Sequence, residues 1–191
     1  MTRGRLEAFS DGVIAIIITI MVLELRVPHD ASWRSLVPIA PVFLSYVLSF
    51  VFVGIYWSNH HHLLQVVERV NGGVLWANLH LLFWLSLTPF VTAWMGENKF
   101  AAVPVALYGG VLLGAAIAYF ILARSLLAIH APDSPLATAL GADFKGKISM
   151  AIYLLAIPLA FVRSWLACLL YILVAVMWLV PDRRIEKTIA R

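Results

Sequence analysis

The sequence predicts an all-α integral membrane protein, and three observations support this fold class. First, 62% of the 191 residues are hydrophobic and only 13% are charged, far from the composition of a soluble domain. Second, apolar stretches long enough to cross about 30 Å of hydrocarbon recur along the chain. Third, the lysine, arginine and tryptophan residues gather near the ends of these stretches. We therefore expect a lipid bilayer to be the main solvent of this chain.

Six hydrophobic stretches of roughly 15 to 22 residues are predicted to be transmembrane helices. They form one domain over residues 1–191, because the polar connections are too short to hold a soluble domain. The polar stretch 130–147 contains proline and glycine breakers and is interpreted as a loop or interfacial segment. Arg163 and Ser164 alone separate the last two helices, which indicates a tight hairpin. The predicted helices cover residues 9–25, 37–57, 75–95, 103–123, 148–162 and 165–180.

The distribution of positive charge predicts how the helices are oriented. With a cytoplasmic N-terminus, only four of the 14 lysine and arginine residues fall on the outer side, namely Arg26, Arg34, Lys99 and Arg163. Both termini, including the basic tail 181–191, are then cytoplasmic, and the chain is expected to be a multi-pass protein of the cell (inner or plasma) membrane. The net charge of +4 reflects this topology rather than nucleic-acid binding, since the basic residues form no single patch.

The first hydrophobic run is expected to be a retained helix. Arg3 and Arg5 precede it, as basic residues precede the apolar core of a signal peptide, but acidic residues interrupt the run and no A-x-A cleavage site follows. The single cysteine, Cys168, excludes a disulfide within the chain.

The first predicted helix carries both an apolar stripe and an acid. At about 100° per residue, Ile16, Thr19, Ile20 and Leu23 fall on one face, whereas Asp11 lies about 140° from Ile16. A carboxylate at membrane depth is costly unless it faces protein or water. We therefore expect Asp11 to face neighbouring helices in a structural role. From spacing alone, plain helix packing or lipid contact explains the stripe better than a pore does.

Polar side chains that could pair with this helix lie near the cytoplasmic ends of the second and third predicted helices. We expect hydrogen bonds joining Ser10 and Asp11 to one or two of the histidines His60 to His62 and to Asn78; the alternative is that the histidines are solvated at the interface. No metal site is expected. Successive side chains on one helix point about 100° apart, so the three histidines cannot converge on one ion.

One run of the first helix resembles the signature of the transmembrane protein 175 family, the endosomal and lysosomal potassium channels and their prokaryotic relatives. That run is Arg5-x-x-x-Phe9-Ser10-Asp11, followed by Ala15-Ile16 and Thr19. The resemblance spans the first three predicted helices, while the last three match only in length and hydrophobicity. The further matches are Tyr56-Trp57 with His60-His61, Trp76-x-Asn78 and Pro89-Phe90-x-Thr92.

The resemblance implies a homotetramer whose pore is lined by four copies of the first helix. Each subunit would contribute one six-helix repeat, whereas animal members of the family carry two repeats. The family's aliphatic constriction carries over onto Ile16, Ile20 and Leu23, with a threonine layer at Thr19. The family's structural network carries over onto Arg5, Phe9, Ser10, Asp11, Trp57, His60, His61 and Asn78, with His62 leaving the histidine register open.

The expected function is a leak-type potassium-permeable channel, which possesses no catalytic residues and no cofactor besides the permeant K⁺ ions. The chain contains no T-V-G-Y-G carbonyl filter, and Tyr108-Gly109-Gly110 is a different arrangement within a predicted helix. Selectivity must therefore come from side chains, so sodium or proton leakage is also expected. The expected partners are other copies of the chain, the lipid bilayer and monovalent cations, with no nucleic acid.

Two other functions are compatible with the same residues. A proton-coupled secondary transporter would use Asp11 and a histidine as a relay, although the sequence has no internal repeat and no matching pair of broken helices. An intramembrane enzyme would need a nucleophile and a base. Ser10, Asp11 and a distant histidine are only weak candidates for these roles. Unsaturated flux in single-channel steps would distinguish a pore from a transporter.

Overall fold

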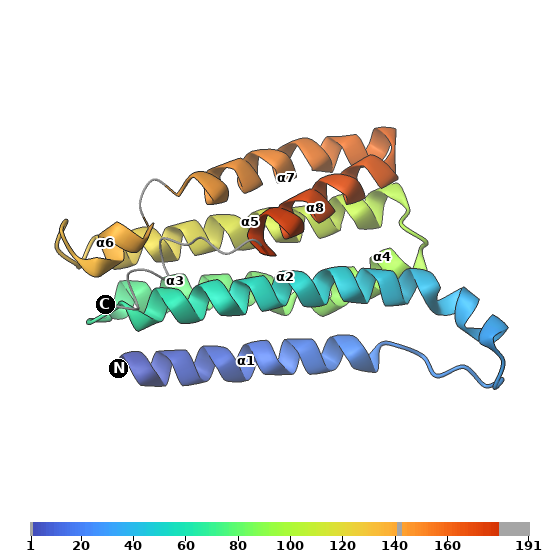
Figure 1. The fold of residues 1–191 in the computed structure, drawn as a ribbon, viewed down its shortest axis with the longest axis horizontal. Coiled ribbons are helices and arrows are strands. Elements are labelled where there is room, and N and C mark those ends of the chain that lie inside the picture. The colour runs from blue at the N-terminus through green and yellow to red at the C-terminus, as the bar shows by residue number, and fades with distance from the viewer. Residues whose placement is uncertain (1, 141–142, 180–191) are drawn as a thin grey trace.

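The chain folds into a bundle of long helices that run alongside one another (Figure 1). The computed structural model describes residues 2–140 and 143–179. The elements are α1 (Arg3–Leu23), the 3₁₀ helix η1 (Trp33–Ile39), α2 (Ala40–Gln65), α3 (Gly72–Ser86), α4 (Thr88–Glu97), α5 (Ala102–Leu127), α6 (Pro135–Leu140), α7 (Phe144–Val162) and α8 (Ser164–Leu179).

Several helical stretches are long and apolar enough to cross a membrane, as expected for a multi-pass protein. Within the described residues these are Arg3–Leu23, Trp33–Gln65, Gly72–Glu97, Ala102–Leu127 and Phe144–Val162. A further apolar helix, α8, has 16 described residues and follows α7 after Arg163 alone, so the predicted tight hairpin is confirmed. The predicted tail 181–191 lies outside the described residues.

The third predicted helix, 75–95, is in fact two helices that meet at Leu87. Pro89 occupies the first turn of α4, where its missing N–H costs nothing, whereas inside a continuous helix its ring would clash with the carbonyl of Leu85. The short helix α6 also forms within the stretch that was interpreted as a loop.

The second predicted helix, 37–57, starts later and ends later than the hydropathy indicates. Pro41 stands in the first turn of α2, and the preceding residues form η1 instead. At the other end the polar residues remain helical up to Gln65, because Leu63 and Leu64 are buried against the bundle. The histidines His60 to His62 are therefore inside a helix and not beyond its end.

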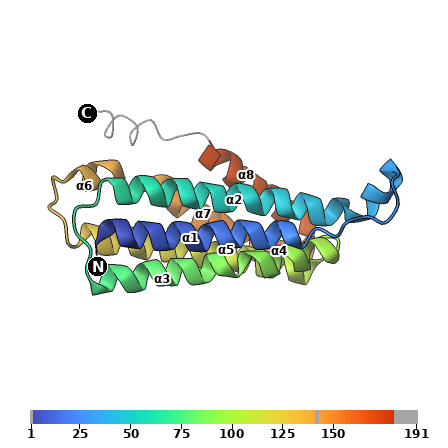
Figure 2. The same cartoon turned by 90° about the horizontal axis from the view of Figure 1, so that it is seen from below.

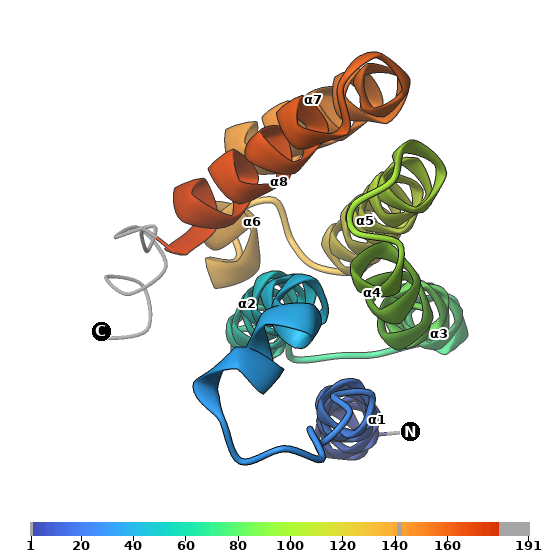
Figure 3. The ribbon, with the colours of Figure 1, turned by 90° about the vertical axis from the view of Figure 1, so that its right-hand side faces the viewer.

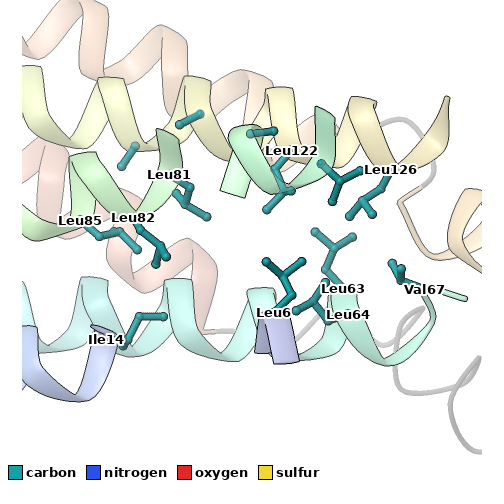
Figure 4. Close-up of a cluster of buried hydrophobic side chains, with 14 of the residues drawn as sticks. Leu6, Ile14, Leu63, Leu64, Val67, Leu81, Leu82, Leu85, Leu122 and Leu126 are labelled. Carbon is teal, nitrogen blue, oxygen red and sulfur yellow. The ribbon is translucent and has the colours of Figure 1, made fainter. Parts of the chain in front are cut away.

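The interior divides into two clusters of buried apolar side chains. The first gathers residues of α1, α2, α3, α5 and α6, among them Leu6, Ile14, Leu64, Leu81 and Leu122 (Figure 4). The second lies between α2, α4, α5, α7 and α8. Helix α1 belongs only to the first cluster. It lies at the edge of the bundle, over the seam between α2 and the α3–α4 pair (Figures 2 and 3).

Candidate pore face and its polar anchors

Helix α1 buries one face, and the opposite face is left uncovered by the part of the chain that the structure describes. The buried residues recur every three or four positions, which is the spacing of one helix face. They are Leu6, Ser10, Ile14, Ile17 and Met21. Burial of this face fixes the direction in which the other face points.

The uncovered face of α1 carries the predicted pore residues. The side chain of Ile16 is 59% exposed, that of Ile20 42% and that of Leu23 76%. Gly12 lies on the same face, and a Cβ added there would meet no atom within 4 Å, so another helix can approach closely. A strongly apolar face that none of the described residues covers is expected to meet lipid or other copies of the chain.

Thr19 is the hydroxyl on this face, and it bonds to its own helix. Its Oγ1 donates a hydrogen bond of 2.8 Å to the carbonyl oxygen of Ala15. This is the local bond that intramembrane threonines commonly make. Because the hydroxyl proton is directed back to the helix, the oxygen lone pairs remain available to a cation on the exposed side.

A buried chain of hydrogen bonds joins α1, α2 and α3. His60 Nε2 lies 2.8 Å from Asn78 Oδ1, and Asn78 Nδ2 donates to Ser10 Oγ at 2.9 Å. Ser10 Oγ in turn donates to the carbonyl oxygen of Leu6 at 2.9 Å. Since an amide oxygen only accepts, Nε2 of His60 carries the proton, and its Nδ1 has no partner among the described residues. Ser10 and Asn78 are completely buried, so this series of hydrogen bonds holds α1 in a fixed position.

Asp11 is anchored separately. Trp57 Nε1 donates to Asp11 Oδ1 at 3.1 Å, so Asp11 faces α2 and not the stripe, in line with its angular position. The expected bonds that join Ser10, Asn78 and a histidine are present, whereas Asp11 bonds to Trp57 and not to a histidine, because Ser10 and Asp11 point about 100° apart on α1.

One helical turn away, a second contact between the same helices repeats this arrangement. His61 Nδ1 lies 3.0 Å from Glu7 Oε1, and Gln65 Nε2 lies 2.8 Å from His61 Nε2. The rings of Trp57 and His61 stack with centroids 6.0 Å apart. Hydropathy analysis missed Glu7 and Gln65 as partners. The signal that could have found them is the shared spacing of four residues, from Glu7 to Asp11 on one helix and from Trp57 to His61 on the other.

The remaining predicted residues lie apart from these bonds. Phe9 is half exposed on the uncovered face, and Arg5 is exposed with no partner in the described part of the chain. His62 contacts only the ring of His61 among the described aromatic groups. Arg3, which was noted only as a basic residue before the first apolar run, donates to the carbonyl oxygens of Gln65 and Val67 and so caps the end of α2.

Within the described ranges, no group of three or more His, Cys, Asp or Glu side chains is arranged to hold a metal ion. His60 and His61 illustrate the reason, because each already bonds to a different helix. The bonds of Ser10, Asp11 and Glu7 link α1 to α2 and α3.

Comparison with known proteins agrees with the resemblance seen in the sequence. The family described as endosomal/lysosomal potassium channel TMEM175 matches residues 5–89. A protein named as a potassium channel in Chryseobacterium sp. is 57% identical over 189 residues, which cover 99% of this chain and 98% of that relative. A protein of Gallus gallus, named as the endosomal/lysosomal proton channel TMEM175, is 35% identical over 83 residues, covering 37% of this chain and 17% of its own length.

A solved structure extends the similarity to the whole fold. The crystal structure of a lysosomal potassium-selective channel TMEM175 homolog from Chamaesiphon minutus matches with a TM-score of 0.82 at 31% identity, covering 93% of this chain and 96% of that one. The names of these relatives are those of ion channels and not of enzymes, in agreement with the absence of predicted catalytic residues. This chain is a multi-pass membrane protein that belongs to the prokaryotic members of the TMEM175 channel family.

Proposed function

We propose that the chain is the subunit of a homotetrameric, potassium-permeable leak channel whose pore is lined by the uncovered face of α1. The observation that carries this proposal is that two opposite faces of α1 have different surroundings. One face is buried and anchored, and the other is apolar and exposed around Ile16. The names of the relatives, which include potassium channels, support the choice of pore over lipid contact for this face.

The anchors of α1 explain why its exposed face can form a constriction of defined width. The Ser10–Asn78 bond and the Asp11–Trp57 bond attach the helix to two different neighbours, so it cannot rotate about its axis. In a four-fold assembly, each Ile16 side chain would then project toward the same axis. Gly12 would allow the four helices to approach one turn below.

Ion passage through such a pore depends on side chains alone. Rings of Ile16, Ile20 and Leu23 would close it by dewetting, and a ring of Thr19 hydroxyls would replace part of the water around K⁺. The proposal includes proton leakage, because neither an aliphatic ring nor a single hydroxyl layer discriminates strongly between monovalent cations. The proposed location is the bacterial cell membrane, with both termini in the cytoplasm and six crossings that include α8.

Replacing Thr19 with valine is expected to preserve assembly and to shift the reversal potential under potassium and sodium bi-ionic conditions toward zero. Valine keeps the shape of threonine but removes the oxygen that would accept the partly dehydrated ion. The measurement is a bi-ionic current recording on purified protein in a planar bilayer. Thr19→Ser restores the oxygen and is expected to keep the parent's preference. An unchanged reversal potential in Thr19→Val would mean that the hydroxyl serves only the bond to Ala15.

A further inference from the structure

An open apolar groove runs between α2 and α8, away from the polar anchors of α1. Its volume is about 660 Å³, within the range of roughly 300–1,000 Å³ that is usual for ligand sites. Both walls are aliphatic along most of their length. The lining includes Leu44, Val47 and Val51 of α2 and Leu169, Ile172 and Val176 of α8.

One end of the groove is positively charged. Lys99 lines it directly, and Arg163 immediately precedes Ser164, which is also part of the lining together with Trp165. The α4–α5 and α7–α8 connections that carry these residues lie at the same end of the bundle (Figure 1). Neither Lys99 nor Arg163 has an acidic partner among the described residues. This end therefore presents cations and a tryptophan, the side chains typical of the lipid headgroup level.

The backbone holds Lys99 at this position. Lys99 and Phe100 both have left-handed conformations, with φ of 49° and 59°. The Lys99 N–H donates to the carbonyl oxygen of Gly96 at 3.1 Å and the Phe100 N–H to that of Met95 at 2.9 Å. This closed turn directs Phe100 against the second buried cluster, while Lys99 stays at the mouth of the groove.

We propose that this groove is a binding site for an anionic phospholipid, with an acyl chain between α2 and α8 and the phosphate on Lys99 and Arg163. The aliphatic walls match the chain, and the two cations match the phosphate oxygens through charge-assisted hydrogen bonds. Because lipid tails are as apolar as the groove, the headgroup contacts must supply the preference for one lipid over another. Helix α8 lies on the side of the bundle away from α1, so this site is separate from the proposed pore face (Figure 3).

The test is native mass spectrometry of the purified full-length protein, titrated with dioleoyl phosphatidylglycerol or with dioleoyl phosphatidylcholine. The parent is expected to retain phosphatidylglycerol preferentially. The double variant Lys99→Ala/Arg163→Ala is expected to bind it about tenfold more weakly or worse, as for the loss of a charge-assisted bond. The matched control, Arg34→Ala/Arg69→Ala, removes two exposed cations that lie outside the groove lining and is expected to bind like the parent.

A second variant tests the groove without changing its charge. Val176→Trp places a large side chain in the groove from a position that is already exposed, and it is expected to reduce lipid retention while folding normally. Equal retention of the two lipids by the parent would overturn the proposal, as would parental binding in the double variant. If Val176→Trp changed the number of subunits and not the number of lipids, the groove would hold a second copy of the chain and the proposal would be wrong.

Discussion

Replacing Ile16 with asparagine is expected to raise potassium flux into proteoliposomes by about tenfold or more, which corresponds to lowering the barrier to permeation by about 1.4 kcal/mol. Ile16 projects from the uncovered face of α1. Four aliphatic side chains at this level would exclude water from the constriction, whereas four amide groups would keep it hydrated. The measurement is potassium-gradient flux at matched protein density.

The matched control for this variant is Val22→Asn. Val22 is also exposed on α1, but it lies about 120° around the helix from Ile16, so the added amide would not face the pore axis. If Ile16→Asn had the flux of the parent, or if both variants raised the flux equally, Ile16 would not be part of the constriction.

Replacing Asn78 with alanine is expected to destabilise the protein by about 3 kcal/mol, because it removes two buried hydrogen bonds and because a buried donor left unpaired costs roughly 1–3 kcal/mol. The Nε2–H of His60 loses its partner, and Ser10 Oγ loses the donor from Asn78 while it keeps its own bond to the carbonyl oxygen of Leu6. For a chain of this size, the thermal midpoint is expected to fall by about 6–12 °C. The measurement is thermal unfolding followed by size-exclusion chromatography, which also reports loss of the assembly.

Two further variants calibrate this result. His80→Ala removes an exposed histidine of α3 that accepts only from Trp84 on its own helix, and it is expected to behave like the parent. Asp11→Ala removes a half-buried partner of Trp57 and is expected to cost less, about 1 kcal/mol, while affecting assembly before ion selectivity. An Asn78→Ala variant with parental stability and altered ion preference would show that the hydrogen-bonded side chains of Ser10, Asn78 and His60 belong to the permeation path instead.

The hydropathy of the sequence was sufficient to locate the long apolar helices but not their ends. Apolar runs report the part of a helix that lies in hydrocarbon, whereas the polar residues up to Gln65 are kept helical by the tertiary burial of Leu63 and Leu64. The break at Leu87 was readable in principle. Pro89 disfavours a continuous helix, but the residues on both sides of it are apolar, and the prediction followed this apolar run across the proline.

The polar anchors were predictable as a class, and their pairing was not. Ser10, Asn78 and His60 stood out because buried polar groups in a membrane must find partners. Which histidine meets Asn78 depends on the rotation of α2 about its axis, and this is set by packing across the whole bundle. The same limit applies to the stripe on α1, since its spacing fixes which residues share a face and leaves open what that face meets.

The most direct test of the proposed pore is thiol modification during single-channel recording of Ile16→Cys. The parent contains only Cys168, so the parent and a Val22→Cys variant serve as controls for the reagent. If this face of α1 lines the pore, a water-soluble methanethiosulfonate reagent is expected to reduce the unitary potassium currents irreversibly in Ile16→Cys and to leave them unchanged in both controls. Saturating flux without unitary steps, or modification of Val22→Cys in place of Ile16→Cys, would contradict a pore lined by this face of α1.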